Sequence, residues 1–174
     1  MKNIAFLVSG NIRIYEKNLS FLANLKKEFY NYEIIFVNDG STDSTEQIIN
    51  DIIDKNPKVQ LISFQRNYGK ALALSQAFKI VSGEIVITID GDLQDDPKEF
   101  KNLISKINEG WDLVSGWKRV RKDSYFKILA SKIFNLITRY KTGINSHDFN
   151  CGLKAYRLKV VKSIKLYGHF HRFI

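Results

Sequence analysis

The chain has 174 residues, of which 44% are hydrophobic and 26% charged, a size and balance typical of one globular domain with a sizeable core. It contains no run of 18 apolar residues, so no segment is predicted to span a bilayer. Residues 1–8 are too short for the apolar core of a signal peptide and are interpreted as a strand. Because Cys151 is the only cysteine, no intrachain disulfide is possible, and a reducing, intracellular setting is expected.

The net charge of +9 is unevenly distributed along the chain. Residues 1–110 carry 13 Lys and Arg against 15 Asp and Glu, whereas residues 111–174 carry 14 against 3. The basic last third predicts an anionic partner, and nucleic acid, an anionic membrane and a phosphorylated substrate are the candidates. No nucleic-acid-binding motif accompanies the charge, which disfavours that class. A solvated basic face without a partner is the remaining alternative.

Short apolar runs alternate with segments of helical periodicity. Strands are predicted at 4–8, 33–37, 59–64, 84–89 and 111–115. Helices are predicted at 16–29, 45–54, 70–81 and 97–110, with Gly83 as a C-terminal cap. This alternation predicts an α/β fold, an open and mostly parallel sheet with helices on both faces. Ligands bind such sheets beyond the carboxyl ends of the strands, where polar clusters follow three strands at 38–41, 65–67 and 90–92.

The densest chemical signal is the pair Asp90 and Asp92, which ends the fourth predicted strand. Mg²⁺ and Mn²⁺ prefer hard oxygen ligands, few of them from protein and the rest from phosphate and water. Asp92 and the amide oxygen of Gln94 are predicted to hold such an ion, which would neutralise a departing diphosphate, while Asp90 binds a ribose hydroxyl. A solvated turn with a helix cap is the alternative, and we assign that role to Asp95 and Asp96. An EF-hand is excluded because the acidic run follows a strand.

Six segments in this order resemble the family-2 glycosyltransferases, in particular the branch of dolichyl-phosphate mannosyltransferase and bacterial polyprenyl-phosphate glycosyltransferases. They are residues 37–45, 66–70, 90–97, 115–118, 121–124 and 147–157. The last three favour the lipid-phosphate branch over polysaccharide synthases. The resemblance implies a GT-A type nucleotide-binding fold. It also implies a single catalytic domain over residues 1–174, with a nucleotide-sugar-binding half at 1–110 and a basic acceptor-binding half at 111–174.

The resemblance further implies roles for the matching positions on the donor side. Asp39 would contact the base or ribose, and Asp90 the ribose or diphosphate. Arg66 and Lys70 would meet the nucleotide, although Lys70 could instead simply begin a helix. The implied nucleotide-sugar site is Asp39, Gly40, Ser41, Arg66, Lys70, Asp90 and Asp92, and the implied metal ligands are Asp90, Asp92 and Gln94.

The sequence departs from the family pattern in two places. Family members open with a strand that runs into Pro-x-Tyr-Asn-Glu, whose Tyr and Glu help to seat the nucleotide, whereas residues 8–12 here are Val-Ser-Gly-Asn-Ile. The family also continues past a His-Arg-Phe-Ile-Pro segment into a further strand and a basic loop near the donor. This sequence stops at residue 174, so a C-terminally truncated catalytic domain is expected.

On the acceptor side, Lys118, Lys127 and Ser131 match positions at which the dolichyl-phosphate enzymes bind the acceptor phosphate. Lys127 and Ser131 are four residues apart and would share a helix face, while Arg119 and Arg121 could supply the bidentate fork that a lysine lacks. Asp148 matches a family Asp near the acceptor and is interpreted as an orienting group, and His147 as a base or a structural donor. The implied acceptor-phosphate residues are Lys118, Arg119, Arg121, Lys127 and Ser131, and the implied catalytic residues are Asp92, Lys118, Arg121 and Asp148.

Residues 125–140 combine an apolar stripe with interspersed Lys and Arg. A basic amphipathic helix of this kind can lie in a membrane interface, and packing against the sheet is the alternative. The two can coexist, because the apolar arc is wider than one contact needs. The expected localisation is cytoplasmic, at the inner face of the membrane.

The predicted function is the inverting transfer of a sugar from a nucleotide-diphosphate sugar to a polyprenyl phosphate of the undecaprenyl or dolichyl type. A lipid phosphate bears most of its charge near neutral pH and needs no strong general base. Catalysis would rest on alignment and on stabilising the departing diphosphate. Two alternatives stay open. One is a transferase that acts on a sugar hydroxyl, with Asp148 or Asp123 as base. The other is a catalytically silent, membrane-associated scaffold with the same fold.

Overall fold

The structure is a computed structural model, and it describes residues 3–9, 25, 28, 29, 31–91, 95, 96, 98–117, 125–143, 148, 149, 151–166 and 168. Within 125–142 it describes the side chains at 131, 133 and 135–141 only.

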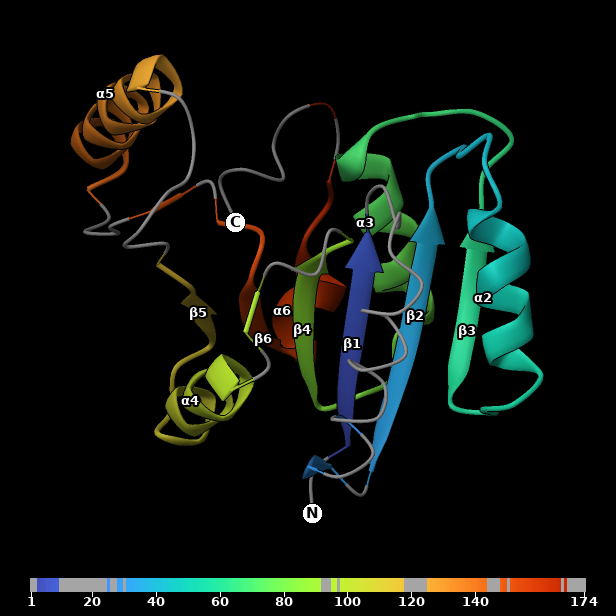
Figure 1. Ribbon diagram of the computed structural model, residues 1–174. Helices are drawn as coiled ribbons and strands as arrows, with labels where there is room; N and C mark the ends of the chain where they lie inside the picture. Colours follow the sequence, from blue (N-terminus) through green and yellow to red (C-terminus); the bar gives the residue numbers. More distant parts are fainter. Residues whose placement is uncertain are drawn as a thin grey trace.

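The described part of the chain forms a six-stranded sheet with the strand order β3-β2-β1-β4-β6-β5 (Figure 1). The strands are β1 (Ile4–Ser9), β2 (Tyr32–Asn38), β3 (Val59–Ser63), β4 (Ile85–Asp90), β5 (Leu113–Ser115) and β6 (Lys154–Arg157). The first four pair in parallel, and β6 runs antiparallel between β4 and β5. The carboxyl ends of β1 to β5 therefore lie at one edge of the sheet, which we call the carboxyl edge.

Helices cover both faces of this sheet. They are α2 (Thr45–Ile53), α3 (Lys70–Ile80), α4 (Lys98–Asn108), α5 (Tyr125–Thr142) and α6 (Leu158–Ser163). The apolar residues of α3 and α6 pack on one face, and those of α2 and α4 on the other. Figure 1 shows α5 standing apart from the sheet.

The core consists of two apolar layers separated by the sheet. In β1, Phe6 and Val8 point toward the layer of α2 and α4, whereas Ala5 and Leu7 point toward the layer of α3. Every residue of β1 and β2 is buried. Because both faces of these parallel strands are covered, their sequences are apolar almost throughout instead of alternating. Fully burying each large aliphatic side chain contributes about 1.5–3 kcal/mol, so these central strands form the stable platform of the site.

The predicted α/β architecture is confirmed, and the five predicted strands and three of the four predicted helices lie within a few residues of their expected positions. The predicted helix at 16–29 falls mostly outside the described residues. The structure adds two elements that the sequence did not predict, β6 and α6. β6 is a four-residue strand with a lysine and an arginine at its ends, so it lacks the apolar run by which a buried strand is identified.

The expected role of Gly83 as a helix cap is wrong. α3 ends at Ile80 and is followed by the extended residue Val81, and Gly83 is not among the glycines with a positive φ. A Cβ at Gly83 would lie 2.6 Å from the backbone nitrogen of Ala5. The glycine therefore serves the close approach of this turn to β1, and the Glu33 carboxylate accepts the backbone N–H groups of Ser82 and Gly83 at 2.9 and 2.6 Å.

Candidate active site

The side chain of Asp39, just beyond the end of β2, organises the carboxyl edge. Its two carboxylate oxygens accept the backbone N–H groups of Tyr68 and Gly69 at 2.7 and 2.9 Å. These bonds attach the loop between β3 and α3 to the end of β2. The polar cluster at 38–41 is thus bonded to the two residues that follow the cluster at 65–67.

Gly40 allows this contact at the level of the backbone. Its φ of +71° is a left-handed conformation that glycine adopts without steric cost. A Cβ here would lie 2.2 Å from the carbonyl carbon of Arg66, so no other residue fits without moving the loop. Two independent steric reasons, its positive φ and its close approach to Arg66, therefore require a glycine at this predicted nucleotide-site position.

Asn38 orders the residues that follow β2, a role that the sequence analysis missed. It is buried, and its side-chain nitrogen donates to Ser63 Oγ at 3.2 Å and to Glu46 Oε2 at 3.3 Å. Its side-chain oxygen accepts the backbone N–H of Ser41 at 2.9 Å. Asn38 thereby ties the ends of β2 and β3 to the first turn of α2 and shapes the turn at 39–41. The signal available in the sequence was its place at the end of a buried strand.

Lys70 and Asp90 join the third cluster to the other two. Lys70 is the first residue of α3, and its Nζ forms an ion pair with Asp90 Oδ1 at the end of β4. Both side chains are about one-third exposed, 32% and 30%. Lys70 therefore begins a helix and also places a cation beside the acidic strand end, while its contact with the nucleotide stays a prediction. Asp39, loop 66–69, Lys70 and Asp90 form one connected arrangement at the carboxyl edge.

Gly152 packs directly against the Asp90 carboxylate. A Cβ at Gly152 would lie 2.2 Å from Asp90 Oδ2 and 2.4 Å from its Cγ. The carbonyl oxygen of Gly152 accepts the Thr88 hydroxyl at 2.8 Å. Sequence reasoning assigned no role to Gly152 or Thr88, although Gly152 lies within the matched segment 147–157. Its proximity to Asp90 depends on the unpredicted pairing of β6 with β4.

Buried polar groups continue from this point toward β5 and α5. Asp148 is buried, and its backbone carbonyl accepts the Ser115 hydroxyl at 3.3 Å. Lys154, the first residue of β6, is buried, and its Nζ donates to the Phe149 carbonyl at 3.3 Å. Burial lowers the pKa of Lys154 to about 8. Smaller electrostatic effects come, in decreasing order, from Cys151, which raises this pKa, Lys70, which lowers it, and Asp148, which raises it. Burial likewise raises the pKa of Tyr156 above its usual value.

Arg66 lies at the exposed rim of the site. Its guanidinium carbon is 4.9 Å from the centroid of the Tyr68 ring, which packs edge-on against Phe64. Tyr68 is 49% exposed. A cation over an aromatic face is favourable, so the loop presents both a positive charge and an aromatic surface at the carboxyl edge.

Several predicted site residues cannot be placed. Asp92, Gln94, Lys118, Arg119, Arg121, Asp123 and His147 lie outside the described residues. Lys127 lies in α5 at a position where only the backbone is described, and Ser131 is half-buried on the same helix. Among the residues that the structure describes, no three His, Cys, Asp or Glu side chains are grouped to hold a metal ion. The metal ligands and the acceptor-phosphate residues therefore remain predictions.

Among the described side chains of α5, two polar ones are buried and four large apolar ones are exposed. Asn135 and Thr138 are buried, and the Asn135 side-chain oxygen accepts the Phe149 backbone N–H at 3.3 Å. The exposed side carries large apolar side chains: Ile133, Leu136, Ile137 and Tyr140, exposed by 51%, 66%, 51% and 91%. These four apolar residues therefore do not pack on the sheet, which was the alternative considered for the apolar stripe.

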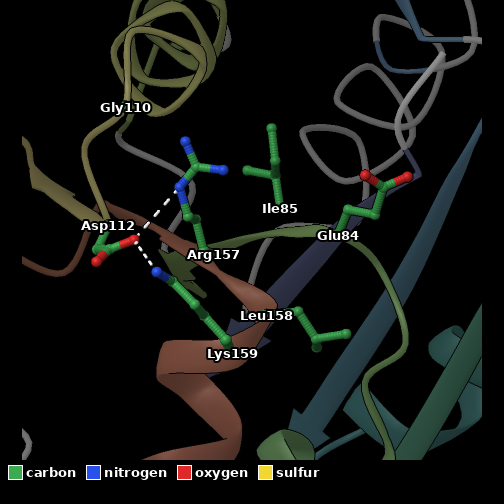
Figure 2. A pocket seen from close by; sticks show the side chains of 7 residues that line it. All are labelled: Glu84, Ile85, Gly110, Asp112, Arg157, Leu158 and Lys159. Atoms are coloured by element: carbon green, nitrogen blue, oxygen red, sulfur yellow. Dashed lines mark ion pairs between the residues drawn. The ribbon is translucent and has the colours of Figure 1, made fainter.

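A hollow of about 560 Å³ lies at the opposite edge of the sheet (Figure 2). Its cations are already engaged: Asp112 pairs with Lys159 at 2.8 Å and with Arg157 at 3.4 Å. Arg157 also donates to the Ile107 carbonyl at the end of α4 at 2.6 Å. The hollow lies where β4 begins, far from the strand ends that carry Asp39 and Asp90, so we do not assign the chemistry to it. No helix in the described part of the chain combines the length and hydropathy needed to cross a bilayer.

Comparisons with known proteins place these observations in a family. The chain is 35% identical over 148 residues to a dodecaprenyl-phosphate galacturonate synthase of Rhizobium johnstonii, covering 83% of this chain and 44% of that protein. It is 34% identical over 166 residues to an undecaprenyl-phosphate 4-deoxy-4-formamido-L-arabinose transferase of Aeromonas hydrophila, covering 91% and 51%. The chain thus spans about half the length of these relatives.

The fold has solved counterparts. A glucosyl-3-phosphoglycerate synthase from Mycobacterium tuberculosis, solved with Mn²⁺ and UDP-glucose, superposes with a TM-score of 0.68 at 20% identity, over 95% of this chain and 59% of that one. The predicted GT-A type fold is confirmed by this likeness. The model of the family described as "Glycosyl transferase family 2" matches residues 16–165. The chain therefore belongs to glycosyl transferase family 2.

Proposed function

We propose that this chain carries the catalytic domain of an inverting glycosyltransferase that moves a sugar from a nucleotide-diphosphate sugar to a polyprenyl phosphate. The observation that carries the proposal is the connected arrangement at the carboxyl edge, in which Asp39, Lys70 and Asp90 are held together by loop 66–69. Ligands bind α/β sheets at this edge. The names of the two relatives, both polyprenyl-phosphate sugar transferases or synthases, support the acceptor class.

On the donor side, Asp39 has acceptor capacity left after its two backbone hydrogen bonds, because each carboxylate oxygen has two lone-pair sites. It can therefore bind an N–H of the base or a ribose hydroxyl while it holds the loop. Arg66 at the rim supplies a positive charge near the phosphates. Lys70 orients Asp90 and contributes a second cation at the strand end.

We also propose a divalent cation, Mg²⁺ or Mn²⁺, and the oxygen ligands that the chain offers at the carboxyl edge suit such an ion. Asp90 presents a carboxylate that is 30% exposed at the strand end, and hard oxygen ligands suit these ions. Asp92 and Gln94 are proposed as the principal ligands. When bound, the ion would neutralise charge on the departing diphosphate. The complex of the structural relative with Mn²⁺ and UDP-glucose supports this choice of cofactor class.

The environment of Asp148 favours a phosphate acceptor over a sugar hydroxyl. A hydroxyl acceptor needs a general base within hydrogen-bond reach. Asp148 is only 2% exposed, and its charge raises the pKa of the buried Lys154, which suits an orienting role. A lipid phosphate is already anionic near neutral pH. Transfer would then rest on alignment for in-line displacement, with inversion at the anomeric carbon.

The exposed apolar side of α5 is proposed to lie in the interface of an anionic membrane. Four large apolar side chains face solvent there, Lys141 at the end of the helix is exposed, and residues 111–174 carry 14 Lys and Arg against 3 Asp and Glu. Each cation near an anionic leaflet contributes about 1 kcal/mol. This surface would bring the site to a lipid-borne acceptor at the cytoplasmic face.

The function is tested by transfer of radiolabelled sugar to undecaprenyl phosphate from a panel of UDP- and GDP-sugars with Mg²⁺ or Mn²⁺. We expect lipid-linked product from at least one donor, and its loss in Asp90→Asn. Product on free sugar acceptors alone would favour the hydroxyl-transfer alternative. A protein that neither binds UDP or GDP nor transfers sugar would be the silent scaffold.

The membrane surface is tested separately by flotation with phosphatidylglycerol and phosphatidylcholine vesicles. Binding should need the anionic lipid and weaken with salt. Leu136→Glu should reduce it roughly tenfold or more, because a buried leucine contributes about 1.5–3 kcal/mol. Ile80→Glu is the matched control, since Ile80 is 48% exposed on α3. Equal loss in both variants would contradict a specific α5 surface.

A further inference from the structure

Lys154 is a buried cation that the reaction outlined above does not use. It opens β6, opposite Thr88 of β4 and Ser115 of β5, and it is only 4% exposed. Lysine is almost never fully buried unless it has partners. The cost of desolvating its ammonium group must therefore be offset by the contacts that it makes inside the protein.

The Lys154 side chain contacts its own short segment, residues 148, 149 and 151–154, which we call the crossing segment. The Lys154 ammonium donates to the Phe149 carbonyl at 3.3 Å. Asp148, also buried, and Cys151 are close enough to raise the pKa of Lys154, and Lys70 is close enough to lower it. The charges of Asp148, on the acceptor side, and of Lys70, which pairs with Asp90, thus both act on the Lys154 ammonium.

The crossing segment is attached to both sides of the proposed site. On the donor side, Gly152 packs on the Asp90 carboxylate, and the Thr88 hydroxyl donates to its carbonyl at 2.8 Å. On the acceptor side, the Phe149 N–H donates to Asn135 of α5 at 3.3 Å. Through these contacts the segment links α5 to the end of β4, and a bond from Lys154 to Phe149 closes the segment on itself.

We propose that Lys154 is a positioning residue whose buried ammonium holds the crossing segment in shape and so keeps α5 at a fixed place relative to Asp90. The inference rests on the proposed function, since α5 carries Lys127 and Ser131, the predicted acceptor-phosphate residues. Removing the ammonium should release Phe149 and Asp148, shift α5, and leave the arrangement of Asp39 and loop 66–69 unchanged. Binding of the acceptor and binding of the nucleotide should therefore respond differently.

The test compares Lys154→Met, which keeps an unbranched side chain one atom shorter but removes the ammonium group, with Lys159→Met. Lys159 is a matched control because its side chain is 69% exposed at the opposite edge of the sheet. With undecaprenyl phosphate as the varied substrate, Lys154→Met should raise the acceptor KM about tenfold, since small misplacements of binding groups are costly. The Kd for UDP or GDP with Mn²⁺ should stay within about twofold of the wild-type value. Lys159→Met should change neither constant.

Hydrogen exchange provides a measurement that does not depend on activity. In Lys154→Met, amide exchange should become faster in α5 and at Phe149 and stay unchanged at Tyr68 and Gly69. If the wild-type protein transfers no sugar, the proposed function fails, and this measurement still decides whether Lys154 fixes α5. If Lys154→Met does not fold, Lys154→Arg should show the same separation, because the larger guanidinium moves the contact with Phe149. The proposal is overturned if Lys154→Met leaves both the acceptor KM and the amide exchange of α5 unchanged. It is also overturned if the nucleotide Kd rises in parallel with the acceptor KM.

Discussion

The two halves of the molecule place their functional groups by different means. In the first half, the strand ends carry Asn38, Asp39 and Asp90 to one edge because β1, β2 and β4 are parallel and buried on both faces. In the second half, placement depends on buried polar side chains such as Asn135 and Lys154, both of which bond to the backbone of Phe149. Strand topology gathers the donor-side residues at one edge, where hydrogen bonds such as those of Asp39 then fix the loop, whereas the described acceptor-side residues are placed by side-chain hydrogen bonds to Phe149.

This difference makes the junction between the halves the most sensitive point. Gly152 meets Asp90 there, with no room for a Cβ. Gly152→Ala should displace the Asp90 carboxylate or push the crossing segment away, and transfer should fall by about 100-fold or more, since displacement by about 1 Å can have that effect. The measurement is kcat/KM for transfer to undecaprenyl phosphate, together with the Kd for UDP or GDP with Mn²⁺.

Gly83→Ala is the steric control for this prediction. Its Cβ would also be blocked, at 2.6 Å from the Ala5 backbone nitrogen, but at the opposite edge. Overpacking of this kind lowers the free energy of unfolding by about 1–3 kcal/mol, and it should leave the kcat/KM of the folded protein unchanged. If the two variants lost transfer equally, the effect at Gly152 would reflect general destabilisation and the junction would have no special role.

The burial of Lys154 also predicts a pH dependence of the free energy of unfolding. Its pKa in the folded protein is about 8, below the usual 10.5, because of burial. Between these values the unfolded chain binds more protons than the native one, so stability rises with pH. From pH 7 to 9.5 the free energy of unfolding should increase by about 2 kcal/mol on this account.

Urea unfolding of the wild type and Lys154→Met measures this contribution as a difference between the two proteins. The variant should lack the rise. The range ends at pH 9.5 because the pKa of Tyr156 is raised by burial, and above pH 10 the unfolded chain releases a proton that the native protein keeps, which lowers stability. Parallel pH curves for the two proteins would show that Lys154 does not titrate as its burial requires.

The contrast between the halves also explains what could be predicted from the sequence. β1, β2 and β4 can be recognised in the sequence as apolar runs. Polar residues at the carboxyl ends of parallel strands lie at the same edge of the sheet. β6 is short and begins with Lys154, which is buried only because other elements surround it. Hence the contact of Gly152 with Asp90 and the bond from Phe149 to Asn135 could not be derived from periodicity. The hydrogen bonds of Asp39 to loop 66–69 also required coordinates, since nothing in the spacing of these residues specifies them.

A smaller effect is expected when the donor half is loosened at Asp39. Asp39 accepts the N–H groups of Tyr68 and Gly69 with its two oxygens. Asp39→Asn keeps one oxygen for one of these N–H groups and places its own NH₂ group against the other, which loses its hydrogen bond. One lost hydrogen bond to a charged group costs about 1.5–3 kcal/mol, part of which loop relaxation recovers. We expect the Kd for UDP or GDP with Mn²⁺ to rise about tenfold, which corresponds to 1.4 kcal/mol. Amide exchange in α5 should be unchanged.

Asp51→Asn is the control in the same half, because Asp51 is exposed on α2. It should leave the nucleotide Kd unaltered. An Asp39→Asn protein that binds nucleotide normally but exchanges faster in α5 would reverse the assignment of the two halves.

The smallest effect is expected at the edge opposite the proposed site. Asp112 is 54% exposed and pairs with Arg157 and Lys159 beside the 560 Å³ hollow. Exposed pairs contribute about 0–1 kcal/mol, and Arg157 retains its bond to the Ile107 carbonyl. Asp112→Asn should therefore lower the free energy of unfolding by less than about 1 kcal/mol and leave nucleotide Kd and acceptor KM unchanged. The two cations freed in this variant would attract phosphate more strongly. A changed nucleotide Kd, tighter binding above all, would therefore indicate that the hollow takes part in the chemistry and would contradict the assignment of the site to the carboxyl edge.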